Sequence, residues 1–368
     1  MSNNRPRLLV IGPLPPPFGG IALFVWNIYR NKILRRKYRI YIHRTGKRFK
    51  AIGHLRQSLI ELGRIFRLFI YMMFYKYDLI HIHTSSYWGF AYNVIYFILS
   101  KLPNKNAKII IHVHSGEFLQ FYKSLSYGAR YFVKRILETA DSVLVTSPKW
   151  VKEFKELISS RLNITYITNG YDPNTFKIID KVDARRRLNL PLDKKIILCV
   201  ANFYPVKGHV YLVMAVKKLV HQRRDILVVL VGEGPLKDRI KDLINRCNLN
   251  EYFSMINWIT PEALNLFYNG SDVVVLSSLA EGSPLVLLEA LGCGKPFVGT
   301  KVGGIQDIIT SEKYGLLCEP KDFECLAEKI LNALNTEWDN DDIRRYGSKY
   351  TWEAVSLRLL SIYKIMLG

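Results

Sequence analysis

The chain has 368 residues, of which 49% are hydrophobic and 23% are charged. This length suits two domains, and the composition excludes a disordered protein. The net charge is +22 and is unevenly placed, because residues 1–180 hold 28 Lys and Arg against 9 Asp and Glu. The first half is therefore strongly basic and the second nearly neutral, which indicates an anionic partner for the first half.

The apolar runs and the cysteines bear on where the protein works. All five cysteines lie after residue 198 without a CxxC pair, a pattern typical of reduced thiols in a cytosolic protein rather than of disulfides or a zinc site. The longest apolar stretches, Leu68–Tyr75 and Tyr87–Leu99, are too short or too polar to span a bilayer. No signal peptide is evident, and we expect a soluble chain.

Short apolar runs that alternate with helix-length segments predict two doubly wound α/β domains. The expected strands cover residues 7–11, 78–83, 107–114 and 142–146 in the first half, and 194–200, 226–231, 273–276 and 296–299 in the second. Such alternation is typical of parallel sheets covered on both faces. We expect a first domain over 1–178, a linker over 179–192 and a second domain over 193–350. A helix over 351–368 is expected to pack back on the first domain, and ligands to bind in a cleft at the carboxyl ends of both sheets.

The first strand leads into a glycine- and proline-rich loop that ends in Gly19 and Gly20. Two adjacent glycines allow a ligand to approach the backbone, and the helix that follows offers unpaired N–H groups to an anion. A stiff proline turn without a ligand explains the loop equally well, since glycine-rich turns are weak signals.

A more specific segment runs from Glu281 to Glu289 after the strand at 273–276. Ser283 is expected to cap the helix that follows, and Pro284 suits its first turn. The N–H groups near Leu285 and Val286 could bind a diphosphate, and the Glu289 carboxylate could accept hydrogen bonds from a ribose diol. The alternative is a capped surface helix with two solvated acids.

The two acids eight residues apart, followed by Ala-Leu-Gly-Cys-Gly, resemble the E-x7-E signature of retaining GT-B glycosyltransferases, with family 4 (GT4) the closest match. Further elements of that family follow in its order: the Gly19-Gly20 loop, Asn169-Gly-Tyr-Asp172, Val206-Lys-Gly208, Val231-Gly-Glu-Gly-Pro235 and Lys301-Val-Gly-Gly-Ile305. The resemblance covers nearly the whole chain. It implies a metal-independent hexosyltransferase that uses a nucleotide-sugar donor and no cofactor.

The resemblance also implies roles for single residues. Lys207 would neutralise the departing diphosphate, Glu281 would hold the donor sugar, and Glu289 would hold the ribose. His114 would lie by the sugar from the first domain. The remaining donor-binding residues implied are Gly19, Gly20, Asn202, Gly232, Gly234, Ser283, Pro284, Leu285 and Val286. Asn202 stands where the family usually has arginine, and the loss of that fork of donors is expected to weaken phosphate binding.

Two other patterns could suggest metal sites. His81, His83, His112 and His114 form two His-x-His pairs at strand ends, and each pair lies on one face of a strand, as metal ligands often do. No acid lies close in sequence, so we expect His114 to line the cleft and His81 to be structural, and we leave His83 and His112 open. Asp339-Asn-Asp-Asp342 contains an Asp-x-Asp pattern but follows no strand, and it is expected to be a solvated loop.

The basic residues of the first half intermix with apolar ones over residues 44–76. Leu59, Phe66 and Phe69 alternate there with arginines, a composition that suits a helix resting on an anionic membrane. A second aromatic and basic stretch covers 118–135. The alternative is a helix that packs on its own sheet and leaves a solvated basic face. For the apolar side chains of residues 44–76, this packing is favoured over contact with a membrane. No nucleic-acid-binding motif is present.

These patterns predict a glycosyltransferase at the cytoplasmic face of the cell membrane. The expected partners are a nucleotide-sugar donor, a lipid-linked or saccharide acceptor and an anionic membrane surface, and the expected setting is bacterial surface-polysaccharide biosynthesis. A sugar-nucleotide epimerase on the same fold and a catalytically weakened membrane-associated scaffold are the alternatives.

Overall fold

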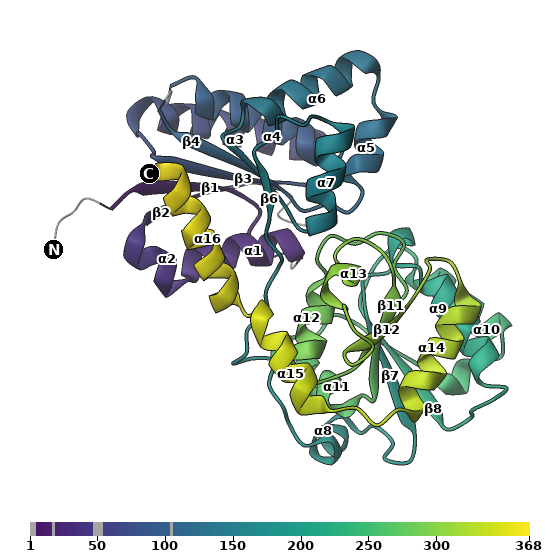
Figure 1. Ribbon diagram of the computed structural model, residues 1–368. Coiled ribbons are helices and arrows are strands. Elements are labelled where there is room, and N and C mark those ends of the chain that lie inside the picture. The colour runs from purple at the N-terminus through teal and green to yellow at the C-terminus, as the bar shows by residue number, and fades with distance from the viewer. Residues whose placement is uncertain (1–4, 17–18, 47–53, 104–105) are drawn as a thin grey trace. The chain divides into compact units, whose positions relative to one another are not determined.

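The computed structural model describes residues 5–16, 19–46, 54–103 and 106–368. The chain forms two compact units, each built on one six-stranded sheet with helices around it (Figure 1). The first unit is Met1–Gly170 together with Trp352–Gly368, and the second is Tyr171–Thr351. Every strand pair in both sheets is parallel, which confirms the predicted pair of doubly wound α/β domains.

The first unit has the strand order β2-β1-β3-β4-β5-β6. Its strands are β1 (Arg7–Gly12), β2 (Arg39–Arg44), β3 (Leu79–Thr84), β4 (Lys108–Val113), β5 (Ser142–Val145) and β6 (Ile164–Tyr166). Its helices are α1 (Gly20–Arg30), α2 (Lys32–Lys37), α3 (His54–Phe74), α4 (Trp88–Lys101), α5 (Phe118–Ser124), α6 (Tyr127–Thr139), α7 (Pro148–Leu157) and α16 (Trp352–Leu367).

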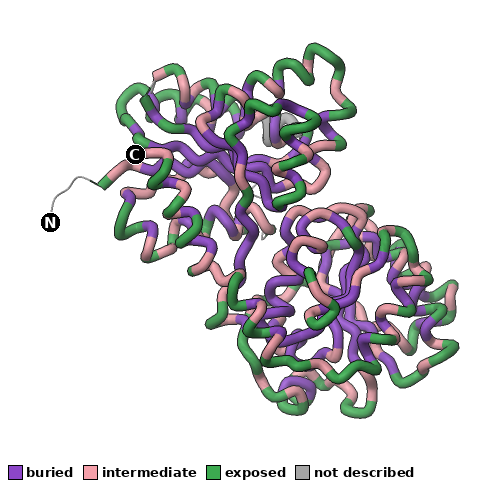
Figure 2. Tube along the Cα trace, viewed as in Figure 1, coloured by how far each residue is buried: buried purple, intermediate pink, exposed green. Residues whose placement is uncertain are grey.

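Two apolar layers lie on the two faces of this sheet. Leu8 and Val10 of β1 pack with residues of α1, α2 and α16, whereas Leu9 and Ile11 pack with residues of α3 to α7. Successive side chains of a strand point to opposite faces, so a continuous apolar run places core residues in both layers. The interior strands β1, β3, β4 and β5 are accordingly buried along nearly their whole length (Figure 2).

The second unit has the strand order β12-β11-β10-β7-β8-β9. Its strands are β7 (Lys195–Val200), β8 (Ile226–Val231), β9 (Phe253–Ile256), β10 (Val273–Leu276), β11 (Phe297–Thr300) and β12 (Gly315–Cys318). Its α-helices are α8 (Lys181–Leu188), α9 (His209–Leu219), α10 (Lys237–Arg246), α11 (Pro261–Gly270), α12 (Leu285–Gly292), α13 (Ile305–Ile308), α14 (Phe323–Asn335) and α15 (Asn340–Gly347). Three 3₁₀ helices complete it: η1 (Pro205–Lys207), η2 (Asn250–Tyr252) and η3 (Ser348–Tyr350).

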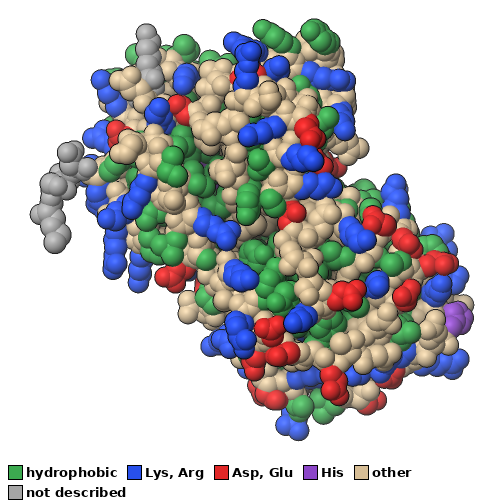
Figure 3. Space-filling model, in the orientation of Figure 1, with side chains coloured by type: hydrophobic (Ala, Val, Ile, Leu, Met, Phe, Trp, Pro, Cys, Tyr) green, Lys and Arg blue, Asp and Glu red, His purple; other side chains and the backbone are tan. Residues whose placement is uncertain are grey.

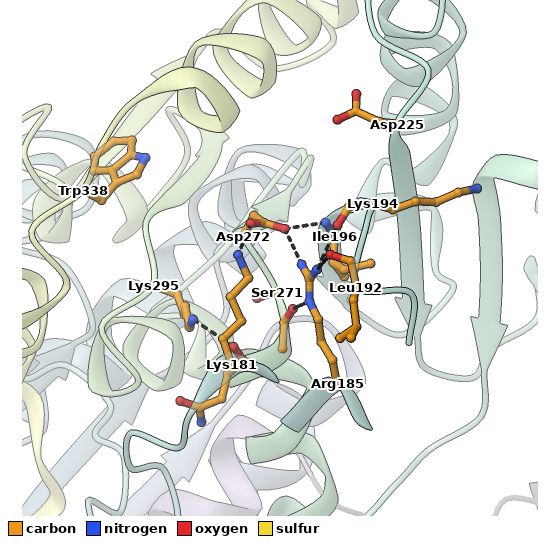
Figure 4. Close-up of polar contacts among 12 residues, drawn as sticks. Lys181, Arg185, Leu192, Lys194, Ile196, Asp225, Ser271, Asp272, Lys295 and Trp338 are labelled. Atoms are coloured by element: carbon orange, nitrogen blue, oxygen red, sulfur yellow. Dashed lines mark hydrogen bonds and ion pairs between the residues drawn. The ribbon is translucent and has the colours of Figure 1, made fainter. Parts of the chain in front are cut away.

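The boundary between the units differs from the predicted one. Residues 171–178 belong to the second unit, where Phe176 packs on Tyr268. The segment 179–192, expected to be a linker, contains α8, whose Arg185 is buried and donates to the carbonyl of Gly270 at 2.8 Å and to Asp272 at 2.7 Å (Figure 4). A buried guanidinium bonded on all sides fixes this segment to the second unit, and its polar sequence concealed that role.

Two further expectations are corrected or settled by the described residues. Asp339 accepts a hydrogen bond from the backbone N–H of Asp342 at 2.9 Å and so caps α15, which means that the Asp-x-Asp pattern starts a helix rather than forming a loop. None of the described helices is both long and apolar enough to cross a membrane.

Candidate functional site

Four of the loops that carry the recognised motifs are neighbours at the carboxyl edge of the second sheet. They follow β8, β7, β10 and β11, which are consecutive in that sheet. Backbone hydrogen bonds join them in the same order: Phe203 N–H donates to the Glu233 carbonyl, Leu279 N–H to Val206, and Gly304 N–H to Gly282, at 2.7–2.9 Å. These four hydrogen-bonded loops therefore form one continuous edge of the second unit, which we call the rim.

Lys207 is held at this rim by the glycine that follows it. Gly208 has a φ of +62°, and a Cβ there would lie 2.1 Å from the carbonyl oxygen of Ser277. The Ser277 hydroxyl donates to the Gly208 carbonyl at 3.0 Å. Only glycine permits this conformation and approach, and the result is that Lys207 lies beside the loop after β10.

Glu281 is the partner of Lys207. The Lys207 ammonium lies 2.6 Å from Oε1 of Glu281, and the Ser278 hydroxyl donates to the same oxygen at 2.6 Å. Glu281 is only 8% exposed, so the expectation of a solvated surface acid does not hold for it. Both bonds fall on Oε1, which leaves Oε2 to accept a hydrogen bond from a ligand.

The loop after β11 contacts the backbone of the loop that carries Glu281. A Cβ at Gly303 would lie 1.7 Å from the Glu281 carbonyl oxygen, and a Cβ at Gly304 would lie 2.4 Å from the Gly282 carbonyl oxygen. The Thr300 hydroxyl donates to the Ser278 carbonyl at 2.5 Å. The glycines of the Val-Gly-Gly motif thus set the position of Glu281 through the backbone.

Glu289 occupies a different environment on α12. It is buried, and the Tyr268 hydroxyl donates to its Oε2 at 2.7 Å. Burial raises the pKa of Glu289 to about 7, and the bond from Tyr268 acts in the opposite direction. This buried acid therefore changes its charge near neutral pH, which also excludes the alternative of a solvated surface residue.

The N-terminus of α12 departs slightly from expectation. The helix begins at Leu285 with Pro284 as its N-cap residue, one position later than the predicted cap at Ser283. Proline has no side-chain acceptor, so the first N–H groups of the helix, among them those of Leu285 and Val286, are not capped by that residue. An anion could satisfy them.

Contacts within the protein, without any ligand, already require glycine at positions 232 and 234. A Cβ at Gly232 would lie 2.2 Å from the Ala201 carbonyl oxygen, and one at Gly234 would lie 2.7 Å from that of Phe203. These glycines allow the loops after β7 and β8 to touch, and donor contact by either remains a prediction. Asn202, between the two contacted residues, is exposed.

Among the predicted residues of the first unit, Gly19 is exposed and Gly20 is half-buried. A Cβ at Gly19 would meet no described atom within 4 Å, and one at Gly20 would meet only Asn169 at an ordinary 3.5 Å. The packing therefore does not require these glycines, and close approach of a ligand stays a prediction for them. His114 is buried, and its Nε2 lies 2.9 Å from Nδ1 of His83.

Two side chains that bond Glu281 and Glu289 were not predicted from the sequence. Ser278 bonds Glu281, and Tyr268 bonds Glu289 from α11. Ser278 lies three residues before Glu281 in a polar loop, which offered a weak signal. Nothing in the sequence pairs Tyr268 with a residue 21 positions away, because that pairing depends on how α11 packs beside α12.

Fold and site together define a GT-B glycosyltransferase. Residues 180–350 match the family profile described as "Glycosyl transferases group 1", and residues 19–175 match the one described as "Glycosyltransferase Family 4". The two profiles cover both units in the family order. The chain belongs to the GT4-type glycosyltransferases, as its motifs predicted, and it is an enzyme of that class.

Known proteins agree with this assignment. An uncharacterized glycosyltransferase of Methanocaldococcus jannaschii is 27% identical over 231 residues, which span 59% of each protein. The D-inositol 3-phosphate glycosyltransferase of Corynebacterium urealyticum is 28% identical over 78% of this chain and 72% of its own length. Sucrose-phosphate synthase from Thermosynechococcus elongatus has the same fold, with a TM-score of 0.80 at 24% identity over 98% of this chain and 99% of that one.

Proposed function

We propose that the protein transfers a sugar from a nucleotide-diphosphate sugar to a lipid-linked saccharide, with retention of configuration and without a metal ion. The second unit binds the donor and the first unit binds the acceptor. Structures of the same fold support the donor class, since an Anabaena protein, HepE, with a TM-score of 0.77 and 18% identity over 97% of this chain and 99% of that one, was solved in complex with UDP. The observation that carries the proposal is the Lys207–Glu281 pair at 2.6 Å.

This pair fits the chemistry of glycosyl transfer. Negative charge grows on the diphosphate as it leaves, while positive charge grows on the sugar carbon. A lysine ammonium stabilises the first charge and a carboxylate the second, and both groups are already positioned before the donor arrives. The N-terminus of α12, where the N-cap residue is a proline, adds fixed N–H dipoles for the diphosphate.

Nucleotide binding provides the first test. Thermal unfolding is measured with UDP, GDP and ADP in turn, each with and without EDTA. A nucleotide present at a hundred times its dissociation constant adds about 2.7 kcal/mol to the free energy of unfolding. We expect one nucleotide to raise the midpoint by the same increment with and without EDTA. The absence of a shift with all three would contradict the proposed donor site.

The pH dependence of the same binding tests Glu289. A ribose diol donates to a carboxylate, so the donor favours ionised Glu289, whose pKa is about 7. Affinity should rise about tenfold from pH 6 to pH 8, because the ionised fraction rises by that factor. Stability of the free protein changes in the opposite direction: the raised pKa means that the folded state loses stability as the pH rises from about 4.5 to 7.

Glu289→Gln is the control for this pH effect. It keeps the shape of the side chain but cannot ionise, so its nucleotide affinity should be low at both pH values. Any pH dependence that it retains measures ionisation of the diphosphate itself. An equal slope in both proteins would exclude Glu289 from the donor site.

A pocket in the first unit supports the acceptor site. Its volume is about 250 Å³, and it lies where β1, β2 and β3 end. Trp88 and Tyr92 contribute aromatic walls, while Glu61, Tyr96 and Asn93 contribute polar groups. Aromatic faces with a few polar anchors are what a sugar ring needs. Trp88→Ala should therefore raise the KM for the acceptor and leave the KM for the donor unchanged.

The orientation of α3 supports attachment to a membrane. Its side chains that face the core include the apolar Leu68 and Met72 and the ion-paired Glu61 and Arg64, while further apolar side chains face solvent. The exposed set on this helix, which we call the α3 face, is Leu59, Leu62, Phe66, Phe69, Ile70, Met73 and Phe74. The expectation that the apolar stripe packs on its own sheet therefore holds for the side of the helix with Leu68 and Met72, and not for the α3 face. Lys47, Arg48 and Lys50 lie outside the described residues, and so does the side chain of Arg56.

Charge strengthens the case for an anionic surface. Lys and Arg side chains are spread over the first unit in the view of Figure 3, and most of the Asp and Glu side chains in view lie over the second. An apolar face that enters the lipid boundary, together with basic residues that each contribute about 1 kcal/mol near anionic headgroups, gives reversible attachment.

Vesicle sedimentation tests the α3 face. The protein should bind vesicles rich in phosphatidylglycerol at low salt, and bind them less at high salt. The double variant Phe66→Ser, Met73→Ser should bind at least tenfold more weakly, because it removes two side chains that bury apolar area in the lipid. Leu357→Ser removes an exposed leucine from α16 and should bind as the parent protein does. No binding by the parent, or equal binding by all three proteins, would contradict attachment through this face.

A further inference from the structure

The first unit contains a cluster of four histidines, of which the proposed reaction gives a role to His114 and not to the other three. His81 and His83 lie on β3, His112 and His114 lie on β4, and all four are buried. His83 and His112 are directly opposite in the strand register. Alternation along the strands places all four imidazoles on the face of the sheet that α1 and α16 cover, against Phe24 and Tyr363.

The nitrogen atoms of this cluster are mostly without partners. His81 Nε2, His83 Nε2, both nitrogens of His112, and His114 Nδ1 are buried and make no hydrogen bond with any residue that the structure describes. A buried polar atom left unbonded costs about 1–3 kcal/mol, so five in one cluster are a large penalty in an otherwise well-bonded sheet. Such a cluster indicates that something binds to these nitrogens.

The bonds that two of these histidines do make are those typical of metal ligands. Nδ1 of His81 lies 2.7 Å from the Tyr363 hydroxyl, and Nδ1 of His83 lies 2.9 Å from Nε2 of His114. In each ring the second nitrogen, Nε2, is the free one. A histidine that binds a metal almost always uses its other ring nitrogen for a hydrogen bond, which fixes its tautomer and orientation.

We propose that His81, His83 and His112 bind a transition-metal ion of the zinc type, through Nε2 of the first two residues and one nitrogen of His112. One ring nitrogen from each of the three residues lies within 4.8 Å of the other two, and tetrahedral zinc with bonds of about 2.0–2.1 Å needs nitrogens about 3.4 Å apart. Small rotations of the imidazole rings would bring the nitrogens to the separation that zinc needs. The fourth position takes a water.

Three neutral histidines and a water are an arrangement in which proteins hold zinc. The ligands carry no charge that would offset the ion, and ionisation of its bound water, which zinc brings near pH 7, reduces the charge to +1.

The position of the cluster gives the ion a structural role. Tyr363 belongs to α16, the last helix of the chain, and its hydroxyl orients His81 from the opposite side of the core. An ion on His81 would therefore link the C-terminal helix to the central strands of the first unit. Metal binding and docking of α16 should stabilise each other.

Metal content and cobalt spectra of the whole protein test this proposal. After removal of loosely bound ions on a chelating resin, we expect about one zinc per chain by mass spectrometry. Replacement by Co²⁺ should give the visible absorption of a tetrahedral site, and zinc should raise the unfolding midpoint of stripped protein. Less than a tenth of an equivalent, together with no cobalt spectrum in the parent protein, would overturn the proposal.

Three variants localise the ion. His112→Gln should lose it, and Tyr363→Phe should bind it 10- to 100-fold more weakly, because it removes the bond that orients His81. His221→Gln removes an exposed histidine of the second unit and should bind as the parent does. Full metal content in His112→Gln would overturn the proposed ligands. The UDP, GDP and ADP increments measured with EDTA report on the donor site alone, so the two proposals fail independently.

Discussion

Lys207→Ala is expected to lower kcat by about 10²- to 10³-fold. The variant removes the ammonium that lies 2.6 Å from Glu281 and that would meet the departing diphosphate, and loss of one such preorganised electrostatic contact has an effect of this size. Nucleotide affinity should fall as well, because the cation contributes to the bound diphosphate. The measurement is release of the nucleotide diphosphate from the donor that the unfolding screen selects, in the presence of a lipid extract.

The control for this experiment lies on the helix that follows Lys207. Lys217→Ala removes an exposed lysine near the far end of α9 and should leave both kcat and nucleotide affinity unchanged. A Lys207→Ala protein that is folded and transfers sugar within twofold of the parent would contradict the proposed mechanism. An inactive parent that still binds anionic vesicles would instead favour the scaffold alternative, for which the missing arginine at Asn202 is the main argument.

The strands show what the sequence could predict of the fold. All eight predicted strands exist, and all eight are interior strands of their sheets. The four that were missed, β2, β6, β9 and β12, are the four edges. An edge strand has a neighbour on one side only, so β2 and β9 contain mostly half-buried residues and lack the continuous apolar run that marks an interior strand.

Some residues of the candidate site could likewise be predicted from the sequence, and others could not. Lys207, Glu281 and Glu289 were predictable because each lies in a motif at the end of a strand, where the glycines that shape the loop are also visible in the sequence. The partners Ser278 and Tyr268 depend on tertiary packing, and so does the outward orientation of the α3 face. The apolar stripe of a helix normally faces the core, but α3 has apolar residues on both sides, so the sequence alone does not indicate which of them face solvent.

The environments of the two acids support different roles. Glu281 is paired with a lysine and a serine, so its charge is offset within the chain. Among the described residues Glu289 is bonded by the hydroxyl of Tyr268, and burial raises its pKa to about 7. Two carboxyl groups whose surroundings differ in this way are suited to different tasks. This difference supports the proposed roles, in which Glu281 stabilises charge at the sugar and Glu289 bonds the ribose.

Gly303→Ala should have the largest effect on stability. Gly303 has a φ of +47°, and the new Cβ would lie 1.7 Å from the carbonyl oxygen of Glu281, which is backbone and cannot rotate away. Left-handed strain and this overlap together should cost about 3 kcal/mol or more. For a domain of this size the unfolding midpoint of the second unit should fall by about 6–12 °C.

The same substitution should also abolish donor binding, because relief of the overlap moves the loop that carries Glu281. Gly128→Ala is the matched control: Gly128 lies near the start of α6, a Cβ there would meet no described atom within 4 Å, and alanine favours the helix. Its midpoint should stay equal or rise slightly, and its nucleotide increment should not change. If Gly303→Ala unfolds normally and still gives the full increment, the loop after β11 does not position Glu281. The Val-Gly-Gly motif would then need another explanation, because the backbone contact that links it to the acid would not be required for binding.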